Sequence, residues 1–250
     1  MIASLLLLLT LADGSFPPPE QLIEKAIAAR KAQDAKGWKF TWHEDEELRD
    51  EKGQPLKPFR KTYDVIMLDG DSYRKLILED GQPLDAKTAK KVEADLEKTR
   101  EERKKHKLFN KTIHMGGLDQ LERLFDSKVT GEETVGGRKT WRVESDPKTG
   151  AKAANASEEE LLATHRITWF DEEEGIDIRR STTYTRDVHK IQKGTHAEIE
   201  WSKVGEAWLP ASQVFRAEVH FFPGIKGFGD RNYRYYNYKR FAAESTFTPN

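Results

Sequence analysis

The chain of 250 residues contains no cysteine, which excludes a large part of protein chemistry at the outset. It has no disulfides, no thiol catalysis, no cysteine-ligated metal and no lipidated N-terminal cysteine. An excess of charge of one sign is also lacking, because 42 basic residues balance 43 acidic ones for a formal net charge of −1. That balance argues against a nucleic acid or an anionic membrane as a partner recruited by bulk charge.

Catalytic motifs are missing as well. The sequence has no GxSxG elbow, no phosphate-binding loop, no HExxH pair and no dinucleotide fingerprint. His189 and His196 flank a turn at residues 193–194 and are placed to face each other, but two histidines without a third ligand are a weak metal signal. The acidic turn at residues 171–174 has few fixed carbonyls and is expected to be solvated. We therefore expect no enzymatic activity, no metal and no cofactor.

The long apolar run at residues 2–12, IASLLLLLTLA, is expected to be a signal peptide. A run of about 11 residues is shorter than the roughly 20 that a membrane-spanning helix needs. Thr10 and Ala12 occupy the small-residue positions of a cleavage site, although no basic residue precedes Leu5. We expect residues 1–12 to be a signal peptide, 13–19 a proline-rich spacer and 20–250 one domain in a bacterial periplasm, with no integral membrane span.

A hairpin between Tyr63 and Leu84 is the most strongly patterned stretch of the chain. Its two arms carry large apolar residues on both faces, and Asp69-Gly70 supplies the reversal because glycine accepts positive φ. A strand with two apolar faces needs cover on both, so we expect this hairpin in the middle of a sheet.

The rest of the chain predicts a mainly antiparallel sheet with few helices. Helical spacing occurs at residues 20–34, 85–107 and 118–125, and Ser157 with Glu160 resembles a capping box. A strand begins at Trp38, and its alternation turns acidic at Glu44 and Glu46. Short turns link the strands, which demands antiparallel pairing. The expected fold class is α+β: an open curved sheet, or half-barrel, of roughly ten strands with helices covering one face.

Aromatic residues are in surplus, with six Trp, seven Tyr and twelve Phe. Each alone is readily explained by core packing. Taken together, they suggest a curved sheet whose concave side holds an apolar cavity. The glycine-rich stretch at residues 221–228 reads either as a mobile mouth of that cavity or as a hairpin tip packed against the protein.

One sequence resemblance supports this interpretation. The run DGDSYRKLILEDGQPLDAKTAKK at residues 69–91 resembles a hairpin followed by a charged helix in uncharacterised exported bacterial proteins of an acidobacterial type. The segments ITWFD (167–171), EAWLP (206–210) and YNYKRFAAES (236–245) look like later elements of the same group. Such proteins are distantly similar to the periplasmic carriers that sort outer-membrane lipoproteins. The resemblance covers roughly residues 20–247 and implies a half-barrel that shields acyl chains, with no catalytic residues to carry over.

Two functions follow as expectations. The first is an exported, non-enzymatic carrier or binding protein for a lipid or acylated ligand, which burial of acyl methylenes would hold. Its expected lining residues are Ile66, Leu68, Leu76, Leu78, Trp169, Trp201, Phe215 and Tyr236. The alternative is an envelope scaffold with a filled cavity, which would bind a partner protein through the polar helix at residues 99–107 and the sheet edge. That polar stretch reads equally as a solvated helix face.

Overall fold

The computed structural model describes residues 16–50, 52, 54–68, 71–105, 117–189, 191–222 and 225–241. The signal peptide and the Asp69-Gly70 reversal lie outside this part of the chain. The strands are β1 Lys39–Arg49, β2 Pro55–Leu68, β3 Asp71–Glu79, β4 Gln82–Pro83, β5 Phe125–Val135, β6 Arg138–Pro147, β7 Thr164–Asp171, β8 Asp177–Tyr184, β9 His196–Val204, β10 Ala207–Phe222 and β11 Ile225–Phe241. The helices are α1 Pro19–Ala35, α2 Ala86–Lys105, α3 Leu118–Leu124 and α4 Ala156–Leu161.

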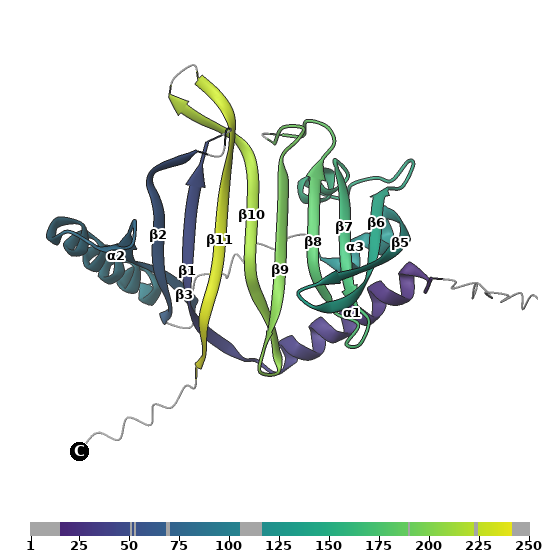
Figure 1. The fold of residues 1–250 in the computed structure, drawn as a ribbon, viewed down its shortest axis with the longest axis horizontal. Coiled ribbons are helices and arrows are strands. Elements are labelled where there is room, and N and C mark those ends of the chain that lie inside the picture. Colours follow the sequence, from purple (N-terminus) through teal and green to yellow (C-terminus); the bar gives the residue numbers. More distant parts are fainter. Residues whose placement is uncertain are drawn as a thin grey trace, which may run out of the picture.

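All eleven strands form one antiparallel sheet in the order β4-β3-β2-β1-β11-β10-β9-β8-β7-β6-β5 (Figure 1). Strands that follow each other in the chain pair with each other, except β4 and β5, which are the two edges of the sheet; β1 also pairs with the last strand, β11. The chain therefore runs outward from β1 to the edge strand β4, continues at the opposite edge with β5, and returns strand by strand to β11 beside β1. This confirms the expected open antiparallel half-barrel, with eleven strands in place of about ten.

The opening hairpin is correctly predicted as a hairpin but wrongly placed. Its arms are β2 and β3, paired from Lys61 with Glu79 to Leu68 with Asp71. Beyond β3 lies only the two-residue strand β4, so the hairpin stands at one end of the sheet and not in its middle. Helix α2 covers it there, because Leu96 is buried and Lys75 pairs with Glu93 at 2.6 Å.

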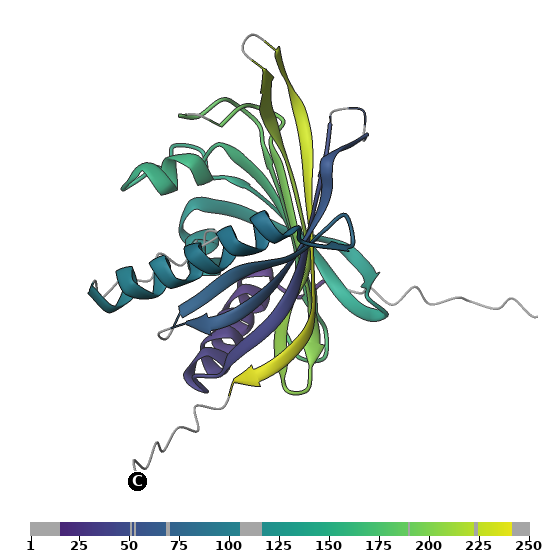
Figure 2. The same cartoon turned by 90° about the vertical axis from the view of Figure 1, so that its left-hand side faces the viewer.

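The main apolar core lies at the other end, where α1 and α3 pack on β5, β6 and β7. Leu22, Ile23 and Ala26 are buried at helical spacing on α1, which confirms the amphipathic helix expected there. They contact Leu121 and Phe170, both fully buried. Helix α1 thus lies at the β5 end of the sheet and α2 at the β3 end, and Figure 2 views the sheet from the end that α2 covers.

The polar half of α2 is anchored to the hairpin. Arg103 donates hydrogen bonds to the backbone carbonyls of Leu68 at 2.8 Å and Asp71 at 3.1 Å. These contacts give this part of the helix a structural role at the β2–β3 end. Among the described residues, no helix is both long enough and apolar enough to cross a membrane.

The N-cap of helix α4 lies two residues earlier than predicted, at Asn155 in place of Ser157. The side chain of Asn155 accepts a hydrogen bond from the Glu158 backbone amide at 3.0 Å, so Asn155 is the N-cap and Ser157 lies inside the helix. Glu158 also accepts from the Ala154 amide at 2.8 Å. Asparagine and serine cap helices about equally well, so the sequence alone does not choose between them.

Candidate functional site

The strand register assigns side chains to the two faces of the sheet, because residues directly opposite each other in neighbouring strands point to the same side. One face, here called the helix face, includes Phe170 and Val143, which pack with α1 and α3. Following the pairs across the sheet, Ile199, Gln213, Tyr233 and Glu46 lie on this same face. Asp45 and its cross-strand neighbours lie on the other face.

The middle of the helix face carries a cluster of tyrosines around two glutamates. We call it the tyrosine floor, and it consists of Glu44, Glu46, Tyr63, Arg74, Tyr233 and Tyr235 from β1, β2, β3 and β11. It lies between α2, which contacts β3, and the α1–α3 pair, which contacts β5. The tyrosines are half-buried, and 44% of the Arg74 side chain remains exposed.

Arg74 holds the two glutamates of the floor together. Its guanidinium lies 2.5 Å from Glu44 and 3.2 Å from Glu46, and it stacks 4.1 Å from the centre of the Tyr63 ring. The hydroxyl groups of Tyr63 and Tyr233 donate to Glu46 at 3.2 and 3.3 Å. The floor is therefore a network of rings and paired charges, held in place by contacts across four strands.

Burial raises the pKa values of one glutamate and of the tyrosines in the tyrosine floor. It raises the pKa of Glu44 above its ordinary value, although the positive charge of Arg74 acts in the opposite direction. Burial and the negative charge of Glu46 raise the pKa of Tyr63 to about 12. Burial also raises the pKa of Tyr233 and of Tyr235. The phenols therefore stay neutral at physiological pH and present hydroxyl donors.

Beside the floor, strands β9 and β10 add larger apolar groups. Phe215 lies opposite Arg231 of β11, and 39% of its surface is exposed. Gln213, two residues earlier, accepts a hydrogen bond from the Tyr235 hydroxyl at 3.1 Å. Trp201 is half-buried next to Arg30 of α1, whose guanidinium lies 4.7 Å from the ring centre. Rings thus continue from the floor toward α1.

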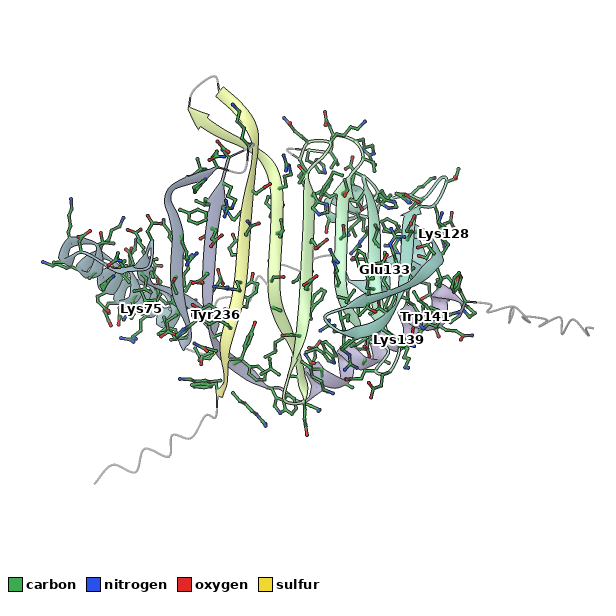
Figure 3. The ribbon with its side chains drawn as sticks, viewed as in Figure 1. Lys75, Lys128, Glu133, Lys139, Trp141 and Tyr236 are labelled. Carbon is green, nitrogen blue, oxygen red and sulfur yellow. The ribbon has the colours of Figure 1, made fainter. Side chains whose placement is uncertain are left out.

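The structure divides the eight predicted lining residues between the two faces. Leu76, Trp201 and Phe215 lie on the helix face, as their pairing with Tyr63, Pro210 and Arg231 shows. Ile66, Leu68, Leu78, Trp169 and Tyr236 lie on the opposite face. Tyr236 donates to Asp45 at 3.2 Å, and Trp169 donates to Glu133 at 2.7 Å. Figure 3 places Tyr236 in the middle of the sheet and Glu133 at its β5 end, so the eight residues do not line one surface.

The tyrosine floor was not among the predicted site residues, although two signals for it exist in the sequence. Glu44 and Glu46 continue the alternation that Trp42 begins, which places them on the same face as that ring. Tyr233 and Tyr235 repeat the same spacing in the last strand. What the sequence does not show is that these two strands pair with each other across about 190 residues.

The two histidines lie in separate hydrogen-bonding environments. His196 Nδ1 lies 3.0 Å from the Thr183 hydroxyl, and His189 Nε2 lies 3.3 Å from Glu159. The described residues contain no cluster of three or more histidine, aspartate or glutamate side chains suited to a metal ion.

The acidic turn after β7 is held by cations of the protein itself. Arg138 binds Asp171 with both Nε and Nη2, at 2.6 and 2.9 Å, and Lys203 binds Glu174 at 2.8 Å. Burial opposes ionisation of Asp171, but the Arg138 hydrogen bonds outweigh it and lower the pKa of that carboxyl. The turn is thus a structural clamp in which arginine and lysine occupy the carboxylates.

Comparison with known proteins gives similar structures but no similar sequence. No protein-family model matches the chain, and no curated protein matches it. Among solved structures, a DUF1329 family protein from Desulfovibrio piger aligns with a TM-score of 0.42 and 11% identity, over 92% of this chain and 96% of that one. A putative outer membrane lipoprotein-sorting protein domain from Vibrio parahaemolyticus gives 0.38 and 8%, over 92% and 96%. A LolA superfamily protein from Nitrosomonas europaea gives 0.35 and 8%, over 91% and 95%. At these TM-scores the likeness is one of general layout, and the function is argued below from the residues of this chain.

Proposed function

We propose that the chain is an exported, non-enzymatic binding protein for an amphipathic ligand, a lipid or an acylated molecule, which lies across the middle of the helix face. The observation that carries the proposal is the exposure of Phe215 and Arg74 beside half-buried tyrosines, between the two packed ends of the sheet. The apolar run at residues 2–12 supports export.

The chemistry of the floor suits a ligand that is partly polar. Rings of tyrosine and phenylalanine offer apolar surface to an acyl chain, while Arg74 and the tyrosine hydroxyls offer hydrogen bonds to a head group. Covering about ten methylenes contributes ~8 kcal/mol, which is the scale of a micromolar complex before the cost of ordering the ligand. A purely apolar ligand would leave the polar groups of the floor without solvent, so we expect it to bind more weakly.

A titration with a fluorescent fatty acid, dansyl-undecanoic acid, tests the proposal on the full chain. Phe215→Asp places a charge on the floor, and we expect it to weaken binding at least tenfold. The matched control is Phe241→Asp, because Phe241 is also an exposed strand phenylalanine, at 45%, but lies opposite Lys39 on the other face. Equal affinity of the two variants would show that the ligand does not lie on the helix face.

An envelope scaffold is the second candidate, and the packing of α1 and α3 favours it. The core that these helices form covers the helix face over β5, β6 and β7, so this part of the face has no room for a ligand cavity. A scaffold needs no lipid, so the absence of any saturable fatty-acid binding in the unchanged protein would favour this candidate.

A further inference from the structure

The tyrosine floor continues as a row of rings toward the end of the sheet where β1 begins. Along β1, Phe40 and Trp42 alternate in step with Glu44, so both rings lie on the helix face. Tyr238 of β11, the strand beside β1 in Figure 1, contacts both: its ring centre lies 6.3 Å from that of Phe40 and 6.0 Å from that of Trp42. We call these three half-buried residues the ring row.

A β-bulge in β11 turns Tyr238 to this face. Simple alternation from Tyr235 would place Asn237 on the helix face and Tyr238 on the other. The register between β1 and β11 shifts at this point, and Asn237 has a positive φ of 54°. One extra residue in this conformation reverses the alternation. Burial raises the pKa of Tyr238, and the nearby Tyr235 and Glu44 add to the rise, as expected for a ring beside the floor.

The floor end of this surface is polar and partly open to solvent. Arg74 and Arg231 lie 3.2 and 3.3 Å from Glu46, and their side chains are 44% and 50% exposed. The Tyr233 hydroxyl donates to the same carboxylate. Guanidinium groups bind carboxylates and phosphates with charge-assisted hydrogen bonds, so this end suits an acidic head group.

The other end of the surface is apolar up to a definite limit. Tyr238 donates its hydroxyl to the Pro210 carbonyl at 2.7 Å, so the ring itself is the surface that it offers to a ligand. Beyond Phe40, the guanidinium of Arg240 lies 4.7 Å from the centre of the Trp38 ring, and this stacked charge ends the apolar row.

The length of the surface sets the length of chain that it can cover. The six-residue step along β1 from Glu46 to Phe40 spans ~20 Å at ~3.3 Å per residue. An extended alkyl chain advances ~1.25 Å per carbon, given bonds of ~1.5 Å and angles of ~111°. A chain of ~16 carbons therefore reaches from the floor to the end of the ring row.

From this polarity and length we propose that the ligand is a long-chain acyl compound of about sixteen carbons, with its acidic head group at Arg74 and Arg231 and its chain along the ring row to Phe40. This rests on the proposed function and adds to it the chain length and the direction in which the ligand lies. Phe215 lies opposite Arg231 at the head end, so the carboxylate of Phe215→Asp would repel the head group.

Competition for dansyl-undecanoic acid on the full chain tests the length and the direction together. Decanoic acid, at ~1.25 Å per carbon, ends well short of Phe40, whereas hexadecanoic acid reaches it. In the unchanged protein we expect hexadecanoic acid to bind at least tenfold more tightly, since each buried methylene adds up to about fourfold in affinity. Phe40→Ser should weaken hexadecanoic acid at least fivefold and leave decanoic acid within twofold.

Three further variants locate the two ends of the ligand. Arg231→Met removes a cation at the head end, so it should weaken both acids by the same factor. Tyr238→Ser, on the other strand of the ring row, should repeat the length-dependent loss, and it keeps the test decisive if Phe40→Ser folds poorly. Phe241→Ser is the matched control and should change neither affinity, because Phe241 is exposed near the same end of the sheet but lies opposite Lys39 on the other face.

The outcomes separate this proposal from the proposed function. Equal losses for the two acids in Phe40→Ser and Tyr238→Ser, or no loss in either variant, would overturn the chain length and direction while fatty acids still bind the unchanged protein. Binding of neither acid to the unchanged protein would overturn both proposals.

Discussion

Asp177, the completely buried first residue of β8, offers a sharp test of how the fold holds a buried carboxylate. Asp177→Asn removes the one buried carboxylate that Arg30 and Arg180 share, at 3.0 and 2.6 Å, and leaves their charges without it. Breaking a buried ion pair by removing one partner costs about 3–5 kcal/mol. In a chain of this size each kcal/mol moves Tm by roughly 2–4 °C, so we expect a fall of about 6–20 °C.

Thermal and urea unfolding, followed by circular dichroism, measure this effect. Asp146→Asn is the matched control, because Asp146 pairs with His165 at 2.8 Å but is 62% exposed, and surface pairs contribute about 0–1 kcal/mol. A Tm for Asp177→Asn within 2 °C of the control would refute the claim that this carboxylate compensates the charges of Arg30 and Arg180.

Two further predictions concern the opposite pH behaviour of neighbouring residues and a helix cap. Thr62, Arg234 and Tyr236 hydrogen-bond Asp45 and lower its pKa despite burial, so its contribution to stability is present above pH ~4 and is lost as the pH falls. The pKa of Glu44 is raised, so its contribution is present below pH ~4 and is lost as the pH rises through the folded value. As the pH rises from 3 to 7, the urea midpoint of Asp45→Asn minus that of the unchanged protein should therefore fall, and the same difference for Glu44→Gln should rise. Differences that do not change with pH would contradict this. Asn155→Ala should cost about 1 kcal/mol in urea unfolding, since the cap bond to the Glu158 amide is lost, and Asn155→Ser should restore most of it; no loss in the alanine variant would count against the cap.

Much of the fold could be predicted from local patterns. The spacing of Leu22, Ile23 and Ala26 predicts α1, and the alternation from Tyr63 predicts the β2–β3 pair. Short turns predict antiparallel order, because adjacent strands can then pair without a crossover. The pairing of β1 with β11 has no such local signal, and it places the hairpin at one end of the sheet.

The faces of the strands could not be predicted, because alternation is symmetric and bulges interrupt it. Leu76 and Leu78 are two residues apart, yet they pair with Tyr63 and Thr62, which point to opposite sides. The extra residue between them, Ile77, reverses the alternation. Half of a set of lining residues chosen by alternation is therefore expected to fall on the wrong face.

The tyrosine floor could not be predicted from the sequence for a related reason. A run such as Glu44-Asp45-Glu46 normally marks a solvated strand, and all three residues are buried here. Arg74 and Arg234 compensate them from about 30 and 190 positions away in the chain. The sequence shows the charges, and only the strand order shows that they meet.

Binding of a lipid or acylated ligand on the helix face is the proposed function of this protein. Native mass spectrometry of the protein recovered from the exported fraction of bacterial cells, followed by solvent extraction and lipid analysis, tests it most directly. We expect a bound species of lipid mass that is released on denaturation and lost in Phe215→Asp but retained in Phe241→Asp. Bare protein that takes up no lipid on incubation would contradict it.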